Sequence, residues 1–389
     1  MKQSGRLADF FDTYTKDLKA EDLQRLFTRD TRDAYHFFAR HVDFTALDGL
    51  PRHRRWAAQA RLLFFAFTLK LSPARRIVYG AALVMALFGF FDLLRLRVAG
   101  TSIGHVTVIV PGLAIPNGMG SLMIAFALLN LLVLLEVADR LSLKNDLEIA
   151  REIQQAMLPS GVYSGDGVET LGLSRPANTV GGDLFDILPL EDGRLVIAVG
   201  DVSGKGSPAA LLMALLLAMM RTLIDEKLEP AELVTRLNLQ VVRHAPGSRF
   251  ITLFYGVYQP LTGELTYVSA GHMPPLVLRG DGTFEHLTDG GIALGMFSGS
   301  AYVAGRTLLR HDELLAVYSD GITEAENPRG QPFDEQGLEA ALMAYRGAEL
   351  AAIGAGVVRA VEIHTADTRF TDDLTILLLR ATVSARAGV

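Results

Sequence analysis

Two long apolar stretches in the first third of the chain most constrain how it can fold. Ile77–Phe91 contains fifteen residues without a charged side chain, and Val98–Leu135 contains no Asp, Glu, Lys or Arg. A membrane-spanning helix needs about 20 mostly apolar residues, with a range of about 17–25. Met119–Leu135 meets this requirement, whereas the first stretch meets it only together with its flanking residues. The pattern predicts a hairpin of two membrane helices over residues 73–138.

The charges around these stretches favour one orientation in a membrane. Seven basic residues lie within 52–76, no acidic residue occurs in 49–91, and Arg140 and Lys144 follow the second stretch. Because basic loops stay on the cytoplasmic side, both flanks are expected there, although Arg95 and Arg97 between the stretches oppose this. The alternative is a buried helical hairpin in a soluble sensor domain. About 75 residues precede the first stretch, which excludes a cleaved signal peptide.

The overall charge hides two regions of opposite sign. The chain of 389 residues has 37 basic and 43 acidic side chains, but residues 1–160 carry +5 and residues 161–389 carry −11. A net acidic chain argues against a nucleic-acid partner. The chain has no cysteine, which excludes disulfides, cysteine-zinc sites and thiol catalysis. We expect four regions, namely a helical cytoplasmic region (1–72), the membrane hairpin (73–138), a helical linker (139–159) and a C-terminal domain (160–389).

One unbroken helix is predicted to join the hairpin to the C-terminal domain. Ser121–Leu158 contains neither Gly nor Pro, so a helix there would be about 57 Å long. In its second half, apolar residues recur at intervals of three and four, which is typical of a narrow coiled-coil seam; they are Leu143, Leu147, Ala150, Ile153 and Met157. We therefore expect a parallel homodimer through residues 139–158. The alternative is a helix packed on its own domain.

Four aspartates in the acidic region each stand beside a glycine or at the end of an apolar, strand-like run: Asp183, Asp201, Asp320 and Asp372. Carboxylates at strand ends can converge, and neighbouring glycines let backbone carbonyls approach. Clustered carboxylates repel one another unless a cation lies between them. Oxygen ligands suit Mg²⁺ or Mn²⁺, and two such ions can bind a phosphoryl group and activate a water.

Six segments then identify a family resemblance over residues 160–380. In order they read VGGDLFD, GDVSGKGSPAALLM, FITLFYGVY, LTYVSAGHMPPLVL, YSDGITEAEN and TDDLTIL. They resemble the metal-dependent type 2C protein serine/threonine phosphatases (PPM), in the bacterial SpoIIE/RsbU-like branch. The resemblance implies an α+β fold, an α-β-β-α sandwich of two antiparallel sheets. Here that domain would follow an all-α N-terminal region containing the transmembrane hairpin.

The resemblance also implies roles for individual residues. Asp201 matches the carboxylate that bridges two metal ions, and Val202 matches the position whose backbone carbonyl completes one site. The remaining metal-centre positions match Asp183, Asp320 and Asp372. Asp373 stands where other members carry Asn, so a structural role is expected. The implied cofactors are two Mn²⁺ or Mg²⁺ ions.

The implied reaction is hydrolysis of phosphoserine or phosphothreonine on a regulatory protein by a metal-activated water, in bacterial signal transduction. An anti-sigma-factor antagonist is one candidate substrate. The chain would be a multi-pass protein of the bacterial inner membrane with its catalytic domain in the cytoplasm. The alternative is a catalytically inactive signalling scaffold with the same fold. Many eukaryotic relatives hold the phosphate with an arginine near the start of the fold, and no counterpart is found here, so the phosphate contact stays open.

Other features of the C-terminal domain have structural explanations. Ala209–Met220 is too short to span a membrane and predicts a buried core helix, with Ser207 as its N-cap and Pro208 at its first position. Gly204–Ser207 lacks the upstream spacing of a P-loop. His272 is more often structural in such a segment than a proton donor. Glu324 and Asn327 are expected to shape the loop after Asp320.

Overall fold

The computed structural model describes residues 51–69, 71–94, 99–103, 106–110, 118–165, 167–245, 249–366 and 370–382. The helices predicted within residues 1–50 lie outside these ranges. Contacts divide the chain into two compact units, Met1–Leu141 and Ser142–Val389. The two units are described separately.

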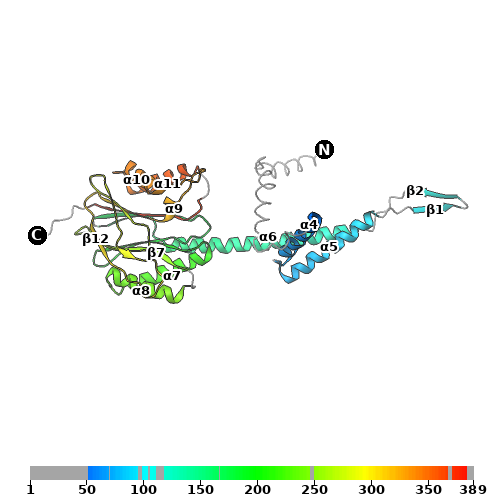
Figure 1. The fold of residues 1–389 in the computed structure, drawn as a ribbon, viewed down its shortest axis with the longest axis horizontal. Helices are drawn as coiled ribbons and strands as arrows, with labels where there is room; N and C mark the ends of the chain where they lie inside the picture. The colour runs from blue at the N-terminus through cyan, green and yellow to red at the C-terminus, as the bar shows by residue number, and fades with distance from the viewer. Residues whose placement is uncertain are drawn as a thin grey trace, which may run out of the picture. The chain divides into compact units, whose positions relative to one another are not determined.

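The described residues of the N-terminal unit are mainly helical. The unit contains α4 (Arg52–Thr68), α5 (Pro73–Leu94) and the first part of α6 (Gly118–Met157) (Figure 1). Between α5 and α6, β1 (Ala99–Ile103) pairs antiparallel with β2 (Val106–Val110). The sequence predicts only a turn in this region, so the expectation of an all-α region needs this small correction. The β-branched residues of the VTVIV segment favour the strand.

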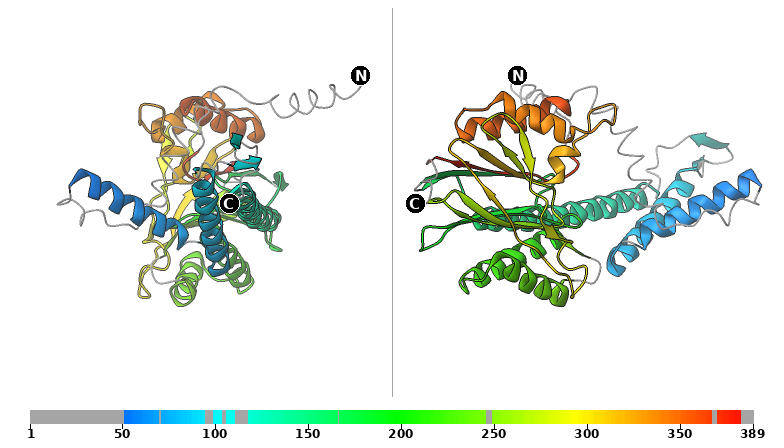
Figure 2. Two further views of the ribbon diagram at one scale, coloured as in Figure 1. Left: turned by 90° about the vertical axis from the view of Figure 1, so that its right-hand side faces the viewer. Right: turned by 60° about the vertical axis from the view of Figure 1, so that its left-hand side comes forward.

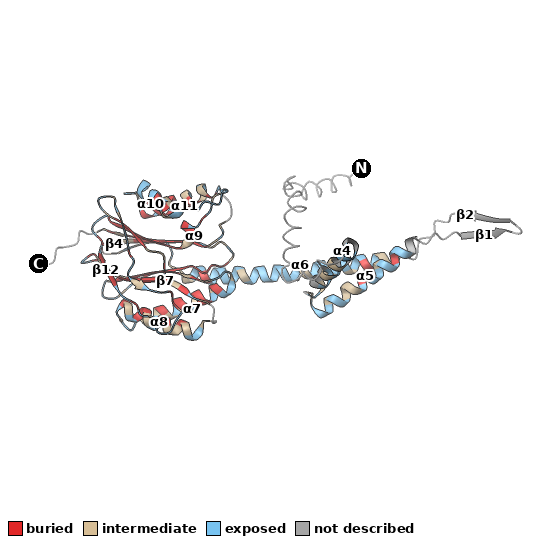
Figure 3. Ribbon diagram, viewed as in Figure 1, coloured by how far each residue is buried: buried red, intermediate tan, exposed pale blue. Residues whose placement is uncertain are grey.

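Three helices in the described part of the chain are long and apolar enough to cross a membrane. They are Pro73–Phe91 in α5, Met119–Met157 in α6 and Ser207–Ile224, which is α7. In α5 and α6, only 11% and 6% of the apolar window is buried (Figure 3). Large apolar side chains such as Phe88 and Phe126 are therefore exposed on both helices. Arg75, near the start of α5, forms an ion pair at 2.7 Å with Asp139, which lies near the middle of α6.

The predicted long helix is confirmed. α6 runs without a break for 40 residues, which corresponds to about 60 Å at 1.5 Å per residue. Its last turns belong to the C-terminal unit, where Met157 packs against the hydrophobic core.

In its described residues, the C-terminal unit contains two sheets and five further helices. One sheet has the strand order β10-β9-β13-β14-β4-β3, and the other has the order β11-β8-β7-β6-β5 with β12 paired to β8. All pairings are antiparallel except the short one between β11 and β8. The strands are β3 (Val162–Gly165), β4 (Val168–Arg175), β5 (Leu184–Pro189), β6 (Leu195–Val202), β7 (Ile251–Gln259), β8 (Glu264–Ala270), β9 (Leu276–Leu278), β10 (Phe284–His286), β11 (Gly290–Gly291), β12 (Gly305–Leu308), β13 (Leu314–Tyr318) and β14 (Leu374–Ala381). The helices are α7, α8 (Pro230–His244), α9 (Asp320–Thr323), α10 (Asp334–Ala344) and α11 (Leu350–His364).

Three buried clusters hold these layers together. One lies between the two sheets, one joins the β5–β8 sheet to α7 and α8, and one joins the other sheet to α10 and α11 (Figures 1 and 2). Because side chains alternate along a strand, β6 turns Val196 and Ala198 toward the helices and Ile197 and Val199 toward the opposite sheet. This arrangement is the predicted α-β-β-α sandwich.

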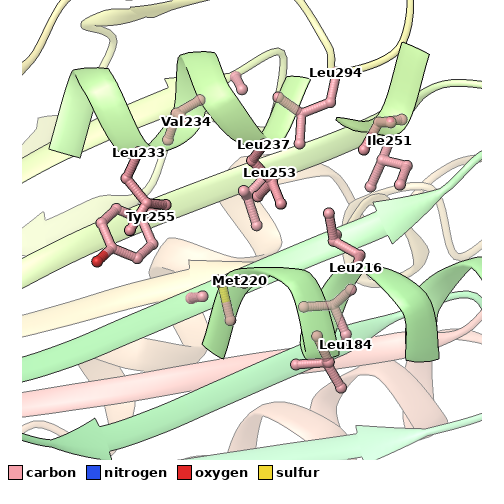
Figure 4. Packing of buried hydrophobic residues seen from close by; sticks show 14 of the residues in the cluster. Leu184, Leu216, Met220, Leu233, Val234, Leu237, Ile251, Leu253, Tyr255 and Leu294 are labelled. Atoms are coloured by element: carbon pink, nitrogen blue, oxygen red, sulfur yellow. The ribbon is translucent and has the colours of Figure 1, made fainter. Parts of the chain in front are cut away.

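The apolar helix α7 is part of this core. Met213, Leu216 and Met220 are fully buried, and Leu216 and Met220 lie close to Leu184 in Figure 4. The expectation of a core helix at 209–220 is therefore confirmed. The helix starts at Ser207, and its N-cap is Gly206, which has a φ of 76°. Ser207 is thus the first helical residue and not the N-cap, because the preceding tight turn needs a glycine in the left-handed region.

Candidate metal centre

The four predicted aspartates lie at the same end of the sandwich. Asp183 directly precedes β5, and Asp201 lies near the end of β6, which pairs antiparallel with β5. Asp320 begins α9 just after β13, and Asp372 lies two residues before β14, which pairs antiparallel with β13. Since antiparallel neighbours place the start of one strand beside the end of the other, each sheet contributes two carboxylates here.

Glycines allow the backbone to approach the carboxylates closely. A Cβ atom added to Gly182 would lie 3.0 Å from the Val202 carbonyl oxygen and 3.6 Å from Asp201 Oδ1. A Cβ atom on Gly321 would lie 2.0 Å from the carbonyl oxygen of Asp373. The Val202 carbonyl thus faces the loop that carries Asp183.

The surroundings of Asp183 and Asp201 disfavour their charged forms. Burial, and then the charge of Asp201, raises the pKa of Asp183 well above its usual value, although hydrogen bonds to Thr375 and Ser319 act in the opposite direction. Burial and the charge of Asp320 raise the pKa of Asp201 to about 6. Two carboxylates with raised pKa values at one place are typical of functional sites.

Asp320 and Asp372 form the outer part of the site. Burial, and then the charges of Glu324 and Asp372, raises the pKa of Asp320. The ammonium of Lys205 lies 2.7 Å from Asp372 Oδ2 and donates a hydrogen bond to the carbonyl of Thr371 at 2.6 Å. Lys205 therefore belongs to this end of the sandwich, although no sequence pattern predicted it there.

Asp373 has the structural role expected of it. Its Oδ1 accepts the backbone N–H of Ala177 at 2.7 Å, and its Oδ2 accepts that of Gly182 at 2.6 Å. These charge-assisted bonds fix the loop before β5, which carries Asp183. Asp373 is buried, with 8% of its surface exposed, and both of its oxygens are occupied by the protein.

A second tether holds the same loop from α6. Gln154 is buried, its side-chain amide donates to the Gly181 carbonyl at 2.8 Å, and its amide oxygen accepts the Gly181 N–H at 3.1 Å. Nearby, Arg221 of α7 binds both carboxylate oxygens of the fully buried Asp186 and donates to the Met157 carbonyl at 2.8 Å. The end of α6 is thus hydrogen-bonded to the segment that carries Asp183.

His272 is buried near the end of β8. Its Nδ1 lies 3.1 Å from the hydroxyl of Thr252, and burial lowers its pKa to about 4.

The side-chain oxygen of Asn327 accepts hydrogen bonds from the N–H groups of Arg329 and Gln331, so Asn327 shapes the turn after α9 as expected.

Among the described residues, a group of His and Glu side chains away from the four aspartates could also hold a metal ion. His286, Glu335 and Glu339 place one ligand atom each within 4.8 Å of the others. His286 Nε2 lies 2.7 Å from Glu335 Oε1, and the buried hydroxyl of Tyr318 donates to Glu335 Oε2 at 3.0 Å. These contacts give the group a structural explanation, because they tie β10 and β13 to α10.

The predicted aspartates fit a divalent cation better. Asp183 Oδ2 is buried and has no hydrogen-bond partner among the described residues, and an unpaired buried carboxylate oxygen is costly unless a cation meets it. The surrounding donors are all oxygens, which suits Mg²⁺ or Mn²⁺. A divalent metal cofactor is therefore consistent with this end of the sandwich.

Comparison with known proteins agrees with this fold. Residues 191–382 match the family model of stage II sporulation protein E (SpoIIE). Over 189 residues the chain is 32% identical to the phosphoserine phosphatase RsbU of Bacillus subtilis, covering 48% of this chain and 56% of RsbU. The chain thus spans about half the length of this relative.

Solved structures give the same result. The RsbU and RsbW domains of Rv1364c from Mycobacterium tuberculosis match with a TM-score of 0.50 and 26% identity, covering 57% of this chain and 62% of that one. The SiaA-PP2C domain of Pseudomonas aeruginosa matches with a TM-score of 0.55 and 20% identity, covering 62% and 98%. In sequence and fold, the C-terminal part of the chain is therefore similar to SpoIIE-type PP2C phosphatase domains, as predicted.

Proposed function

We propose that the chain is a membrane-anchored, metal-dependent phosphatase that removes phosphate from phosphoserine or phosphothreonine of a regulatory protein. The observation that carries this proposal is the meeting of four aspartates, distant in sequence, at one end of a SpoIIE-type domain. RsbU is named a phosphoserine phosphatase, and its substrate chemistry is extended here to this chain. An anti-sigma-factor antagonist is one candidate substrate.

In this proposal, Asp183, Asp201, Asp320, Asp372 and the Val202 carbonyl hold two Mn²⁺ or Mg²⁺ ions. When bound, the ions would supply a water of lowered pKa and balance the charge of the phosphoryl group. The protein contributes the positions of these ligands. Asp373 and Gln154 fix the loop of Asp183 from two sides, which keeps that carboxylate in place at little entropic cost when the ions bind.

The enzymatic proposal is tested by phosphate release from a phosphoserine peptide with Mn²⁺, using the full chain in detergent. Asp201→Asn should abolish release, because the substitution removes a central ligand and its charge. Asp192→Asn is the matched control, because Asp192 lies in an exposed turn and forms its ion pair with Arg194, away from the four aspartates. Equal rates for wild type and Asp201→Asn would favour an inactive scaffold, and EDTA should abolish any true metal-dependent activity.

The membrane part of the proposal places α5 and the first half of α6 across the bacterial inner membrane, with the phosphatase domain in the cytoplasm. The exposed apolar surfaces of both helices support it. Membrane fractionation of the full chain provides the test. Recovery of all the protein in the soluble fraction without detergent would refute it.

We also propose that α6 pairs with a second copy and transmits a signal to the site. Leu143 and Ile153 of the predicted seam are 63% and 59% exposed in the single chain, which supports a partner helix. Replacing both with Glu should shift the mass of the detergent-solubilised protein from dimer to monomer in light scattering. An unchanged mass would count against pairing through this seam.

A further inference from the structure

The loop between β6 and α7, residues 203–206, is held tightly against the start of β7. The Ser203 N–H donates to the Phe250 carbonyl at 3.0 Å, and the Ser203 hydroxyl accepts the Phe250 N–H at 2.9 Å. The guanidinium of Arg249 donates to the Ser203 carbonyl at 2.9 Å. Gly204 and Gly206, with φ values of 99° and 76°, make the loop turn sharply on both sides of Lys205.

Lys205 is the residue that this turn presents to the aspartates. Its ammonium lies 2.7 Å from Asp372 Oδ2, and its charge acts on Asp320 as well. The side chain is 52% exposed, and an exposed ion pair contributes only about 0–1 kcal/mol to stability. Lys205 also stands just before the N-terminal end of α7, where the helix dipole makes a positive charge unfavourable. Stability of the fold therefore does not explain a lysine at this position.

We propose that Lys205 binds the phosphoryl oxygens of the substrate and supplies the phosphate contact for which the sequence offers no arginine. This inference rests on the proposed function. Arg249 is a positioning residue in this scheme, because it holds the loop through the Ser203 carbonyl and not through the substrate. The flexible stem of a lysine lets its ammonium exchange the Asp372 carboxylate for a nearby phosphate.

Charge balance supports this assignment. Five aspartates, namely Asp183, Asp201, Asp320, Asp372 and Asp373, surround the site and carry up to five negative charges. Two divalent cations bring four positive charges, so an arriving phosphate dianion still meets an excess of negative charge. Among the described residues, Lys205 is the cation that interacts with Asp320, Asp372 and Asp373 together. It is therefore placed to reduce the repulsion of the substrate.

The test compares Lys205→Met and Lys205→Arg with wild type in the full, detergent-solubilised chain. Arg306→Met is the control, because Arg306 is an exposed cation whose partner Glu264 lies 3.6 Å away and outside the aspartate site. Calorimetry measures the affinity for Mn²⁺ and, in Mn²⁺-saturated protein, the affinity for inorganic phosphate. Phosphate release from a phosphoserine peptide gives KM and kcat.

Lys205→Met should weaken phosphate binding and raise KM by on the order of tenfold, as expected for losing a hydrogen bond between charged groups. Its Mn²⁺ affinity should be equal to or higher than that of wild type, Lys205→Arg should recover part of the loss, and Arg306→Met should match wild type. Unchanged phosphate affinity in Lys205→Met would overturn the inference, as would a parallel loss of Mn²⁺ affinity.

The same measurements separate this inference from the proposed function. If phosphate binding depends on Lys205 but the wild-type protein releases no phosphate from the peptide, the proposed phosphatase activity is refuted and the phosphate site is supported. If the wild-type protein releases phosphate and Lys205→Met has the same KM, the phosphatase activity is supported and the role of Lys205 is refuted.

Discussion

Replacing Gln154 by alanine should impair the metal centre without unfolding the domain. Gln154 lies in the last turn of α6 and is not one of the predicted metal ligands. Its side-chain amide makes two hydrogen bonds to Gly181, which lies two residues before Asp183. Each bond between neutral groups contributes about 0.5–1.5 kcal/mol. The substitution should therefore destabilise the observed conformation of the loop before β5 by about 1–3 kcal/mol. This corresponds to about a 5- to 150-fold change in the ratio between that conformation and the detached ones.

The assay should separate this local effect from global stability. We expect Gln154→Ala to weaken Mn²⁺ binding in calorimetry and to lower phosphate release within that range, because Asp183 is held less well. The matched control is Gln155→Ala, which changes the same residue type on the exposed side of the helix and should match wild type. Thermal unfolding should show that the sheets of the variant remain folded.

Two results would refute this reasoning. Mn²⁺ affinity and phosphate release that both stay within twofold of wild type in Gln154→Ala would mean that the loop of Asp183 does not depend on α6. An equal loss in Gln155→Ala would mean that the effect comes from the helix surface and not from the hydrogen bonds to Gly181.

Three further predictions concern stability. Asp373→Ala should lower the free energy of unfolding by about 3 kcal/mol, because two hydrogen bonds to a charged group are lost; an unchanged denaturation midpoint would contradict this. Leu216→Ala should cost about 2–5 kcal/mol as a buried cavity forms, whereas Leu211→Ala on the same helix, where the leucine is 73% exposed, should cost little. Burial lowers the pKa of His272 to about 4, so the unfolded chain takes up a proton below about pH 6.5 while the folded chain does not. Stability should therefore fall between about pH 6.5 and 4, and urea titrations should show a weaker fall for His272→Asn.

Much of the C-terminal domain could be predicted because its signals are local. The apolar runs of β6, β13 and β14 are visible in sequence, and each ends or begins at an aspartate that the fold brings to the same end of the sandwich. A structural role for Asp373 was also predicted, because this residue stands where other members of the family carry Asn. The start of α7 was missed by one residue, because the need for a positive φ at Gly206 depends on how the preceding loop turns.

Other parts of the site could not be predicted because they depend on contacts between distant residues. Gln154 looks like one more polar residue on an amphipathic helix, and only the packing of α6 against the loop of Gly181 gives it a role. Lys205 resembles a P-loop lysine in sequence, while its contact with Asp372, 167 positions later, comes from the fold. The β1–β2 pair was missed since five-residue strands between two membrane-like helices carry a weak signal.

The two hydrogen bonds at the end of α6 also restrict how that helix can move. A helix advances about 1.5 Å and turns about 100° per residue. The hydrogen bonds of 2.8 and 3.1 Å to Gly181 would break if the helix slid by much more than a few tenths of an ångström. A screw movement of one residue in one direction would place Gln155 opposite Gly181 and restore an amide there. The same step in the other direction would place Ile153 there and leave both backbone groups of Gly181 unpaired. The two steps therefore differ in their effect on the hydrogen bonds to Gly181, because only one of them keeps a glutamine side chain opposite that residue.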